Sequence, residues 1–202
     1  MAKRQTLLGS ETVNFAKLSA LLMDDNTYSL DVLAIVCLAF GLGDVTKVSS
    51  VGGARAALQR QRHDIFLADT DMGHEDGFQV VEWMRRKAPE DNRWIPCIML
   101  SGHTRRSAVF NSRDCGSHFV VAKPVTPTIL LQRLVWLARD DRAFVDSETY
   151  CGPDRRFQRL GPPTGTKGRR SDDAAPEVSP TTDPGIHQNL ISERESSNEV
   201  MI

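Results

Sequence analysis

The feature that most constrains how this chain folds is a regular alternation of short apolar runs with longer segments of helical periodicity. The runs are rich in Leu, Ile and Val and have the length of buried strands; they occupy residues 18–23, 45–51, 65–68, 95–100 and 119–122. Because parallel strands need a crossover between them, this order predicts right-handed strand–helix–strand units. The predicted fold is an α/β domain with a doubly wound, five-stranded parallel sheet and helices on both faces.

The segments between the runs repeat apolar residues every three or four positions, as a half-buried helix does. The clearest stripes are Leu30, Leu33, Cys37 and Phe40 in the first, Phe78, Val81 and Met84 in the third, and Leu131, Leu134, Val135 and Ala138 in the last. Weaker patterns at 54–58 and 104–111 predict the second and fourth helices.

Composition divides the chain into a folded domain and two ends. Only eight of the 57 residues in 146–202 are Leu, Ile, Val or Phe, too few to offset the entropy of ordering them, so we expect a disordered tail there. Its charge is segregated, with a basic part before residue 171 and an acidic part after it. We expect a flexible N-terminus at 1–16 and one folded domain at 17–145. The tail has no pattern of a second module, so we expect no DNA-binding domain.

Charge and cysteine content exclude several classes of protein. The formal net charge is −1, so a general attraction to nucleic acid or anionic membrane is not expected. The longest apolar run, 32–40, is too short to span a bilayer, and we expect a cytoplasmic protein that does not contact membranes. The four cysteines have no metal-ligand spacing, and Cys37 and Cys97 lie inside apolar runs, which predicts neither disulfides nor a zinc site.

Polar side chains follow four of the five predicted strands. Asp24 and Asp25 come after the first strand, Asp69 after the third, Ser101 after the fourth and Lys123 after the fifth. Each is an ordinary cap or turn residue when taken alone. Ligands of open α/β sheets bind at the carboxyl ends of the strands, so we expect all five side chains to meet at one edge.

Three carboxylates held together repel one another unless a cation neutralises them. Oxygen ligands alone, with a backbone carbonyl available at Asp71, suit a hard divalent ion such as Mg²⁺. Lys123 would supply a fixed positive charge for a phosphoryl group and Ser101 a hydroxyl donor. Asp69 could then act as the nucleophile and become an aspartyl phosphate.

At these residues the sequence resembles the receiver domain of bacterial two-component response regulators, over about residues 17–140. The segment FLADTDMGHEDGF resembles the phosphoacceptor motif, with Asp69 as the phosphorylated aspartate. Asp24 and Asp25 match the acidic pair, IMLSG the hydroxyl-bearing fourth strand, and VVAKPV the lysine with its proline in the cis form. The resemblance implies the flavodoxin-like strand order 2-1-3-4-5. It also implies Mg²⁺ ligation by Asp25, Asp69 and the carbonyl of Asp71, with Asp24 acting through water.

The function implied by the resemblance is phosphorelay signalling. Asp69 would accept a phosphoryl group from a sensor histidine kinase or a phosphotransfer protein, in a self-catalysed step that ends by autodephosphorylation, so the chain would not be an enzyme acting on other substrates. Phosphorylation would change affinity for a downstream protein through the face of the fourth helix, fifth strand and fifth helix, with the protein a monomer or a phosphorylation-dependent dimer. The contact residues expected on that face are Arg105, Arg106, Gln132, Arg133 and Trp136.

Two positions depart from the family pattern. Gly73 stands where the family usually has proline, which should loosen the loop after Asp69 without removing a reactive atom. The position of the family's aromatic switch is Val120, and Phe119 lies one place early. Because strand side chains alternate between the two faces, Phe119 cannot simply replace the missing aromatic ring.

Two alternatives stay open on the sequence alone. Asp69-Thr70-Asp71 resembles the DxD motif of haloacid-dehalogenase-type phosphatases, which also form an aspartyl phosphate with Mg²⁺. In those enzymes, however, the second acidic pair follows the lysine, whereas here Asp24 and Asp25 precede the nucleophile. The other alternative is a pseudo-receiver that binds a partner without being phosphorylated.

Overall fold

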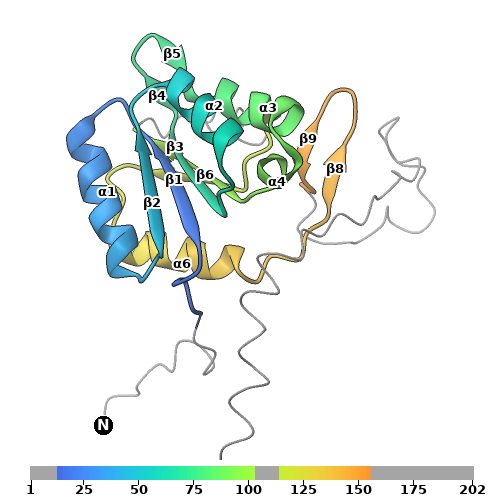
Figure 1. Cartoon of the computed structure of the whole chain (residues 1–202). Helices are drawn as coiled ribbons and strands as arrows, with labels where there is room; N and C mark the ends of the chain where they lie inside the picture. Colours follow the sequence, from blue (N-terminus) through green and yellow to red (C-terminus); the bar gives the residue numbers. More distant parts are fainter. Residues whose placement is uncertain (1–12, 103–113, 156–202) are drawn as a thin grey trace, which may run out of the picture.

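A computed structural model describes residues 13–102 and 114–155. Five parallel strands form its main sheet in the order β2-β1-β3-β6-β7, which in chain order is 2-1-3-4-5 and confirms the predicted doubly wound sheet (Figure 1). These strands are β1 Ser19–Met23, β2 Asp44–Val48, β3 Ile65–Asp69, β6 Cys97–Ser101 and β7 Phe119–Ala122. β2 is shorter than predicted because Ser50 caps the following helix and ends the strand.

The middle strands explain why the apolar runs are nearly continuous. Every residue of β3 and β6 is buried, because helices cover both faces of a parallel sheet. In register, Ala20 of β1 lies beside Ile65 of β3, and Phe66 of β3 beside Cys97 of β6. The strands therefore start together and end together, which brings their carboxyl ends to one edge.

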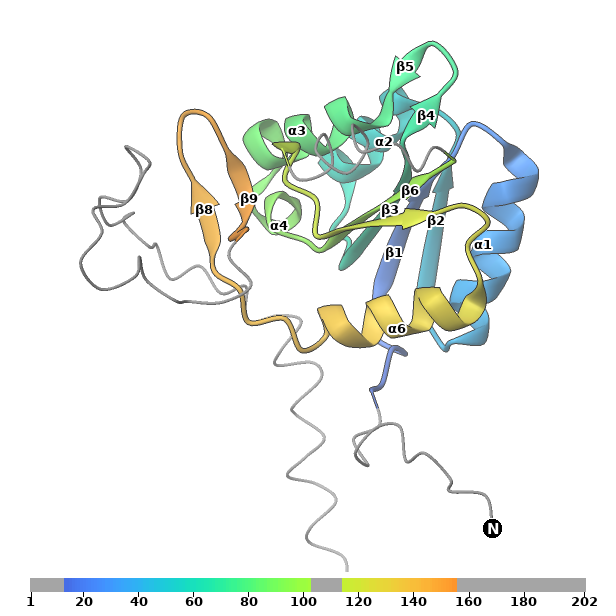
Figure 2. The same ribbon diagram turned by 180° about the vertical axis from the view of Figure 1, so that it is seen from behind.

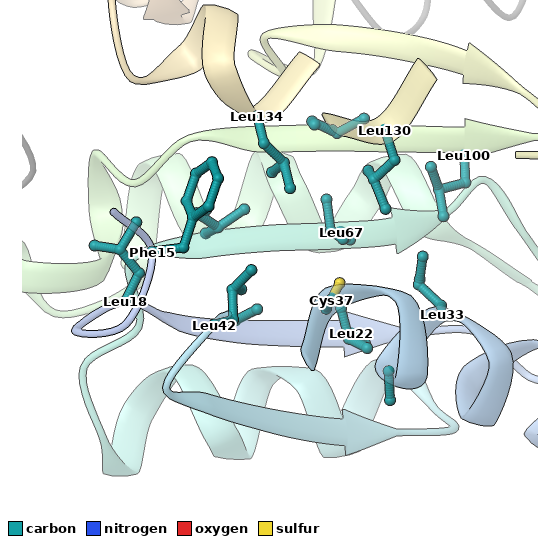
Figure 3. Close-up of a cluster of buried hydrophobic side chains, with 14 of the residues drawn as sticks. Phe15, Leu18, Leu22, Leu33, Cys37, Leu42, Leu67, Leu100, Leu130 and Leu134 are labelled. Carbon is teal, nitrogen blue, oxygen red and sulfur yellow. The ribbon is translucent and has the colours of Figure 1, made fainter. Parts of the chain in front are cut away.

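Helices form a layer on each face of the sheet. They are α1 Thr27–Ala39, α2 Val51–Arg60, α3 Gly77–Lys87, the short α4 Glu90–Arg93 and α6 Pro127–Leu137. α1 and α6 cover one face, and α2 and α3 the other (Figure 2). Figure 3 shows the first of these two cores, in which Leu33 and Cys37 of α1 meet Leu67 of the sheet and Leu130 of α6. The predicted helix at 104–111 lies outside the described residues.

Both predicted ends of the domain are corrected by the structure. Phe15 is buried in the core between α1 and α6, so the predicted flexible N-terminus at 1–16 is wrong for its last residues. At the other end, β8 Phe144–Asp146 pairs with β9 Cys151–Pro153 in an antiparallel hairpin, so the predicted boundary at 145 is too early. The remainder of the predicted tail, 156–202, and residues 1–12 lie outside the described residues.

The β8–β9 hairpin is anchored by a buried arginine of α3. Arg85 is 1% exposed, and its guanidinium donates to the backbone carbonyls of Gly116 at 3.0 Å and Ile95 at 2.9 Å. The same group lies 5.1 Å from the ring centre of Phe144 in β8. The Cys151 thiol of β9 donates to the carbonyl of Arg85 at 3.3 Å. These contacts join residues far apart in sequence, which is why local composition does not reveal them.

All four cysteines are free and buried, which agrees with the prediction that Cys37 and Cys97 act as small apolar residues. Burial raises the pKa of the Cys37 and Cys115 thiols to about 12, so they remain protonated. None of the helices in the described part of the chain has the length and hydropathy needed to cross a membrane.

Candidate functional site

The structure brings the predicted acidic residues together at the carboxyl edge of the sheet. Asp24 and Asp25 directly follow β1, and Asp69 is the last residue of β3. Each offers a carboxylate oxygen, and these three oxygens all lie within 4.8 Å of one another. Asp24 and Asp69 are buried, whereas Asp25 is exposed. The prediction that strand ends gather these groups is confirmed by the geometry.

Local hydrogen bonds fix the loops that carry the carboxylates. Asp24 Oδ1 accepts from the N–H of Asn26 at 2.9 Å, and Asn26 in turn caps α1. Asp69 Oδ1 accepts from the N–H of Asp71 at 3.3 Å, which holds Asp71 beside the same edge. Short polar side chains after a strand commonly bond to the backbone two residues on, and these two bonds orient the carboxylates of Asp24 and Asp69.

Lys123 bridges two of the acids. It follows β7 directly and precedes Pro124 in a cis peptide bond, as predicted. Its Nζ atom donates to Asp24 Oδ2 and to Asp69 Oδ2, each at 2.7 Å. Burial opposes the charge of Lys123, but the hydrogen bonds and charges of Asp24 and Asp69 outweigh that effect and raise the pKa of the ammonium above 10.5. The lysine therefore stays charged between the two carboxylates.

The electrostatics of Asp69 differ from those of an exposed aspartate. Burial raises the pKa of Asp69 above its ordinary value of 3.8, and the charge of Asp24 adds to this effect. The hydrogen bond and charge of Lys123, and then the N–H of Asp71, act in the opposite direction. The carboxylate is thus poorly solvated, and its neighbours are fixed groups of the protein rather than water.

Ser101 is the last residue of β6 and is buried. Its carbonyl accepts from the N–H of Lys123 at 2.7 Å, and the neighbouring carbonyl of Leu100 accepts from the N–H of Thr70 at 2.9 Å. These backbone bonds tie the ends of β3, β6 and β7 to one another. Ser101 therefore stands on the same edge as Asp69 and Lys123, as predicted.

The donor set fits a hard divalent cation. Three carboxylate oxygens converge, one of the acids faces solvent, and the charge of Lys123 does not balance all three carboxylates.

The start of α3 packs closely against the end of β3. Gly77, the first residue of α3, lies so close that a Cβ there would be 1.9 Å from the carbonyl oxygen of Asp69. The loop after Asp69 folds into the small hairpin of β4 Asp71–Met72 and β5 Glu75–Asp76, with Gly73 at a φ of +72° in its turn.

A groove beside the acids was missed by the sequence analysis. It has a volume of about 480 Å³ and is lined by residues of α1 and α6 together with Asp24 and Lys123. Its walls are mostly apolar and include Val32, Val36 and Leu130. The sequence of α1 indicates such a groove, because its apolar residues extend beyond the buried stripe to residues that line the groove, such as Val32 and Val36.

The predicted contact face on the last helix is partly engaged within the domain. The ring of Trp136 packs edge-on against Phe119 with their centres 4.6 Å apart, and the Arg133 guanidinium lies 5.1 Å from the Phe119 ring. Gln132 is exposed, and Arg105 and Arg106 lie outside the described residues. Phe119 packs with the core under α6 while Val120 packs with the opposite core, so the two side chains point to opposite faces as predicted.

The sequence model of the response regulator receiver domain matches residues 20–135. That span is more than half of the chain and includes all six predicted site residues. The chain therefore belongs to the receiver domain family of response regulators, as expected from its motifs. The haloacid-dehalogenase alternative is not favoured.

Among curated proteins, the alginate biosynthesis transcriptional regulatory protein AlgB of Pseudomonas aeruginosa is 28% identical over 117 residues, which are 58% of this chain and 25% of AlgB. AlgB of Pseudomonas putida is 27% identical over 107 residues, covering 53% of this chain and 23% of that protein. This chain therefore matches about a quarter of the length of these relatives.

Solved structures show the same fold. The chemotaxis response regulator CheY4 of Vibrio cholerae has a TM-score of 0.54 and 22% identity, with 59% of this chain and 98% of CheY4 covered. The receiver domain of the sensor histidine kinase PA1611 from Pseudomonas aeruginosa has a TM-score of 0.53 and 28% identity, with 61% of this chain and 97% of that domain covered. That domain was solved with a magnesium ion coordinated in its active-site cleft.

Proposed function

We propose that this receiver domain accepts a phosphoryl group on Asp69 from a phosphohistidine of a sensor histidine kinase or phosphotransfer protein. The observation that carries the proposal is the convergence of three carboxylates within 4.8 Å around a buried Asp69 that Lys123 contacts at 2.7 Å. Family membership and the magnesium-bound PA1611 receiver domain support it. Asp24, Asp25, Asp69 and the carbonyl of Asp71 would hold Mg²⁺, which when bound would neutralise charge on the phosphoryl oxygens.

The residues of the chain account for the transfer as positioning and charge neutralisation. One Asp69 oxygen attacks phosphorus as the bond to the donor nitrogen breaks, and the histidine leaves with its electron pair. Asp69 is poorly solvated, so little water must be removed before it attacks. Lys123 already contacts the reacting carboxylate, and its ammonium would follow the new negative charge onto the phosphoryl oxygens. The Ser101 hydroxyl would donate to another of these oxygens.

The chain itself would supply all the catalytic groups, so transfer to Asp69 and later hydrolysis are proposed as self-catalysed reactions rather than turnover of an external substrate. The apolar groove between α1 and α6 adjoins Asp24 and Lys123, where a donor must arrive, and it has room for apolar side chains of the donor protein. Output would follow as a population shift that changes affinity for a downstream protein at the β7–α6 side.

The test is phosphotransfer from an isolated phosphohistidine domain, with and without Mg²⁺, measured as acid-labile phosphate on the chain. We expect one phosphate per chain with Mg²⁺ and none on Asp69→Asn. Asp71→Asn is the matched control, because it keeps the backbone carbonyl and should be phosphorylated normally. A wild-type chain that takes up no phosphate would favour the pseudo-receiver. Continuous release of phosphate from small phosphomonoesters would instead favour a phosphatase.

A further inference from the structure

The outward face of α1 is unusually apolar. Four of the six large apolar side chains that are exposed among the described residues lie on this helix: Tyr28 is 77% exposed, Val32 45%, Ile35 66% and Leu38 52%. The only charged residue of α1, Asp31, is paired with Lys47 of β2 at 2.6 Å. Surface helices normally turn a polar face to water. In both Figure 1 and Figure 2, α1 lies at the flank of the domain, where a large partner can reach it.

The exposed residues form a regular seam. Tyr28, Val32, Ile35 and Ala39 follow one another at intervals of four, three and four residues, which is the spacing of the contact line in paired helices. All four are exposed, and the seam runs directly opposite the buried stripe of the same helix. The seam contains no charged residue.

We propose that α1 is a self-association surface, on which it pairs with α1 of a second copy of this chain in antiparallel orientation. The register that sets Tyr28 against the second copy's Ala39 also sets Val32 against the second copy's Ile35. Each large ring then faces a small methyl group, and two β-branched side chains meet at the centre. In a twofold dimer the same patch of both copies must be complementary to itself. The seam on α1 meets this requirement in the register described.

The composition of the face favours a second copy over an unrelated partner. The centres of protein interfaces are depleted in charged residues, and a second copy presents a seam that is equally free of charge. With a rise of 1.5 Å per residue, α1 is about 20 Å long, so one helix pair buries less than the roughly 1,200 Å² of a stable complex. The pairing is therefore a weak equilibrium that depends on concentration.

Self-association would also affect access to the site. Tyr28 and Val32 belong to the seam and also line the groove beside Asp24 and Lys123. A second copy on α1 would cover part of the mouth of this groove, so the dimer would be a poorer substrate for a phosphodonor protein than the monomer.

The first test is sedimentation velocity of the full chain over a series of rising concentrations, because a weak self-association is populated only at high concentration. We expect the sedimentation coefficient to rise with concentration for the wild type and to stay at the monomer value for Ile35→Lys. Ile129→Lys is the matched control, because Ile129 is an exposed apolar residue of α6, and it should behave like the wild type. A concentration dependence that Ile35→Lys leaves unchanged would overturn the proposal, even if that variant slows phosphotransfer.

The second test reads the register by disulfide trapping, with the four buried native cysteines left in place. Tyr28→Cys combined with Ala39→Cys should form cross-linked dimers under mild oxidation. Tyr28→Cys alone should not, because two such positions would lie about 16 Å apart in the antiparallel pair. Equal cross-linking by the single variant would show a different arrangement and contradict the proposed pairing.

Discussion

At the scale of single residues, the site is defined by a conflict between burial and charge at Asp69. The carboxylate is buried beside Asp24, and one ammonium, that of Lys123, is shared between them. Such an arrangement favours binding of an added cation, but it reduces the stability of the domain when no cation is bound. The same residues that make the site reactive are therefore expected to destabilise the domain when no cation is present.

The first prediction is that Asp69→Asn stabilises the domain at pH 7 without divalent ions, by about 1 kcal/mol, because it removes a poorly solvated charge. The pKa of Asp69 is higher in the folded state than in the unfolded state, so protonation of this carboxyl favours folding. This stabilisation is fully present below the unfolded pKa near 3.8 and is lost as pH rises through the folded value. The advantage of the variant should therefore shrink towards pH 3.5 in urea titrations. A variant less stable than the wild type at pH 7 would contradict this.

The second residue-scale prediction concerns Gly77, where a Cβ would lie 1.9 Å from the Asp69 carbonyl oxygen. Gly77→Ala must displace the start of α3 or the end of β3. We expect a loss of about 2 kcal/mol in unfolding free energy and slower phosphorylation. Gly52→Ala in α2, with open space around its Cβ, is the control and should be neutral or slightly stabilising. Similar effects for the two variants would show that the close approach at Gly77 does not matter.

At the scale of elements, the sequence predicts what depends on local pattern and misses what depends on distant contacts. Four of the five strands are apolar runs and β2 is a mixed strand with Val at two positions, and parallel pairing brings Asp24, Asp69 and Lys123 to one edge. The β8–β9 hairpin lies in a segment with charged residues, Gly and Pro, and is held by Arg85 of α3 and the backbone of Gly116. No local signal marks such a partner. The groove was missed because it depends on how α1 and α6 pack.

Docking of this hairpin can be measured with two glycines that share the same positive φ. Gly41 and Gly116 both have a φ of +88°, but a Cβ on Gly116 would lie 2.1 Å from the carbonyl oxygen of Cys151, whereas one on Gly41 meets nothing within 4 Å. Gly41→Ala should cost about 1 kcal/mol, the penalty of the left-handed conformation. Gly116→Ala should cost at least about 1 kcal/mol more by thermal or urea unfolding. Equal losses would mean that the hairpin contributes little.

At the scale of the whole molecule, two histidines make stability depend on pH. Burial lowers the pKa of His63, and burial together with the charges of Arg85 and Arg142 lowers the pKa of His118 well below 6.5. His118 Nδ1 accepts from the N–H of Cys97 at 3.1 Å, a bond that protonation would break. Both rings are therefore expected to be neutral in the folded domain.

Their stabilising contribution is present above the unfolded pKa near 6.5 and is lost as pH falls below it, because only the unfolded chain then takes up the protons. Between pH 6.5 and 5.5, each ring should lower the unfolding free energy by up to about 1.4 kcal/mol. His118→Gln should flatten this dependence, measured by urea unfolding in the Asp69→Asn background so that Asp69 does not contribute. An unchanged slope would mean that folding does not lower the pKa of His118, because the folded and unfolded chains would then bind its proton equally well.

The proposed function depends on phosphorylation of Asp69, assisted by the acids and the lysine around it. Its most direct measurement is intact-mass spectrometry of the full chain after incubation with a small acyl phosphate and Mg²⁺, followed by mapping of the modified peptide. We expect one added phosphoryl group at Asp69, no addition without Mg²⁺ or in Asp69→Asn, and much slower addition in Lys123→Ala. An unmodified wild-type chain, or a phosphoryl group on another residue, would contradict it.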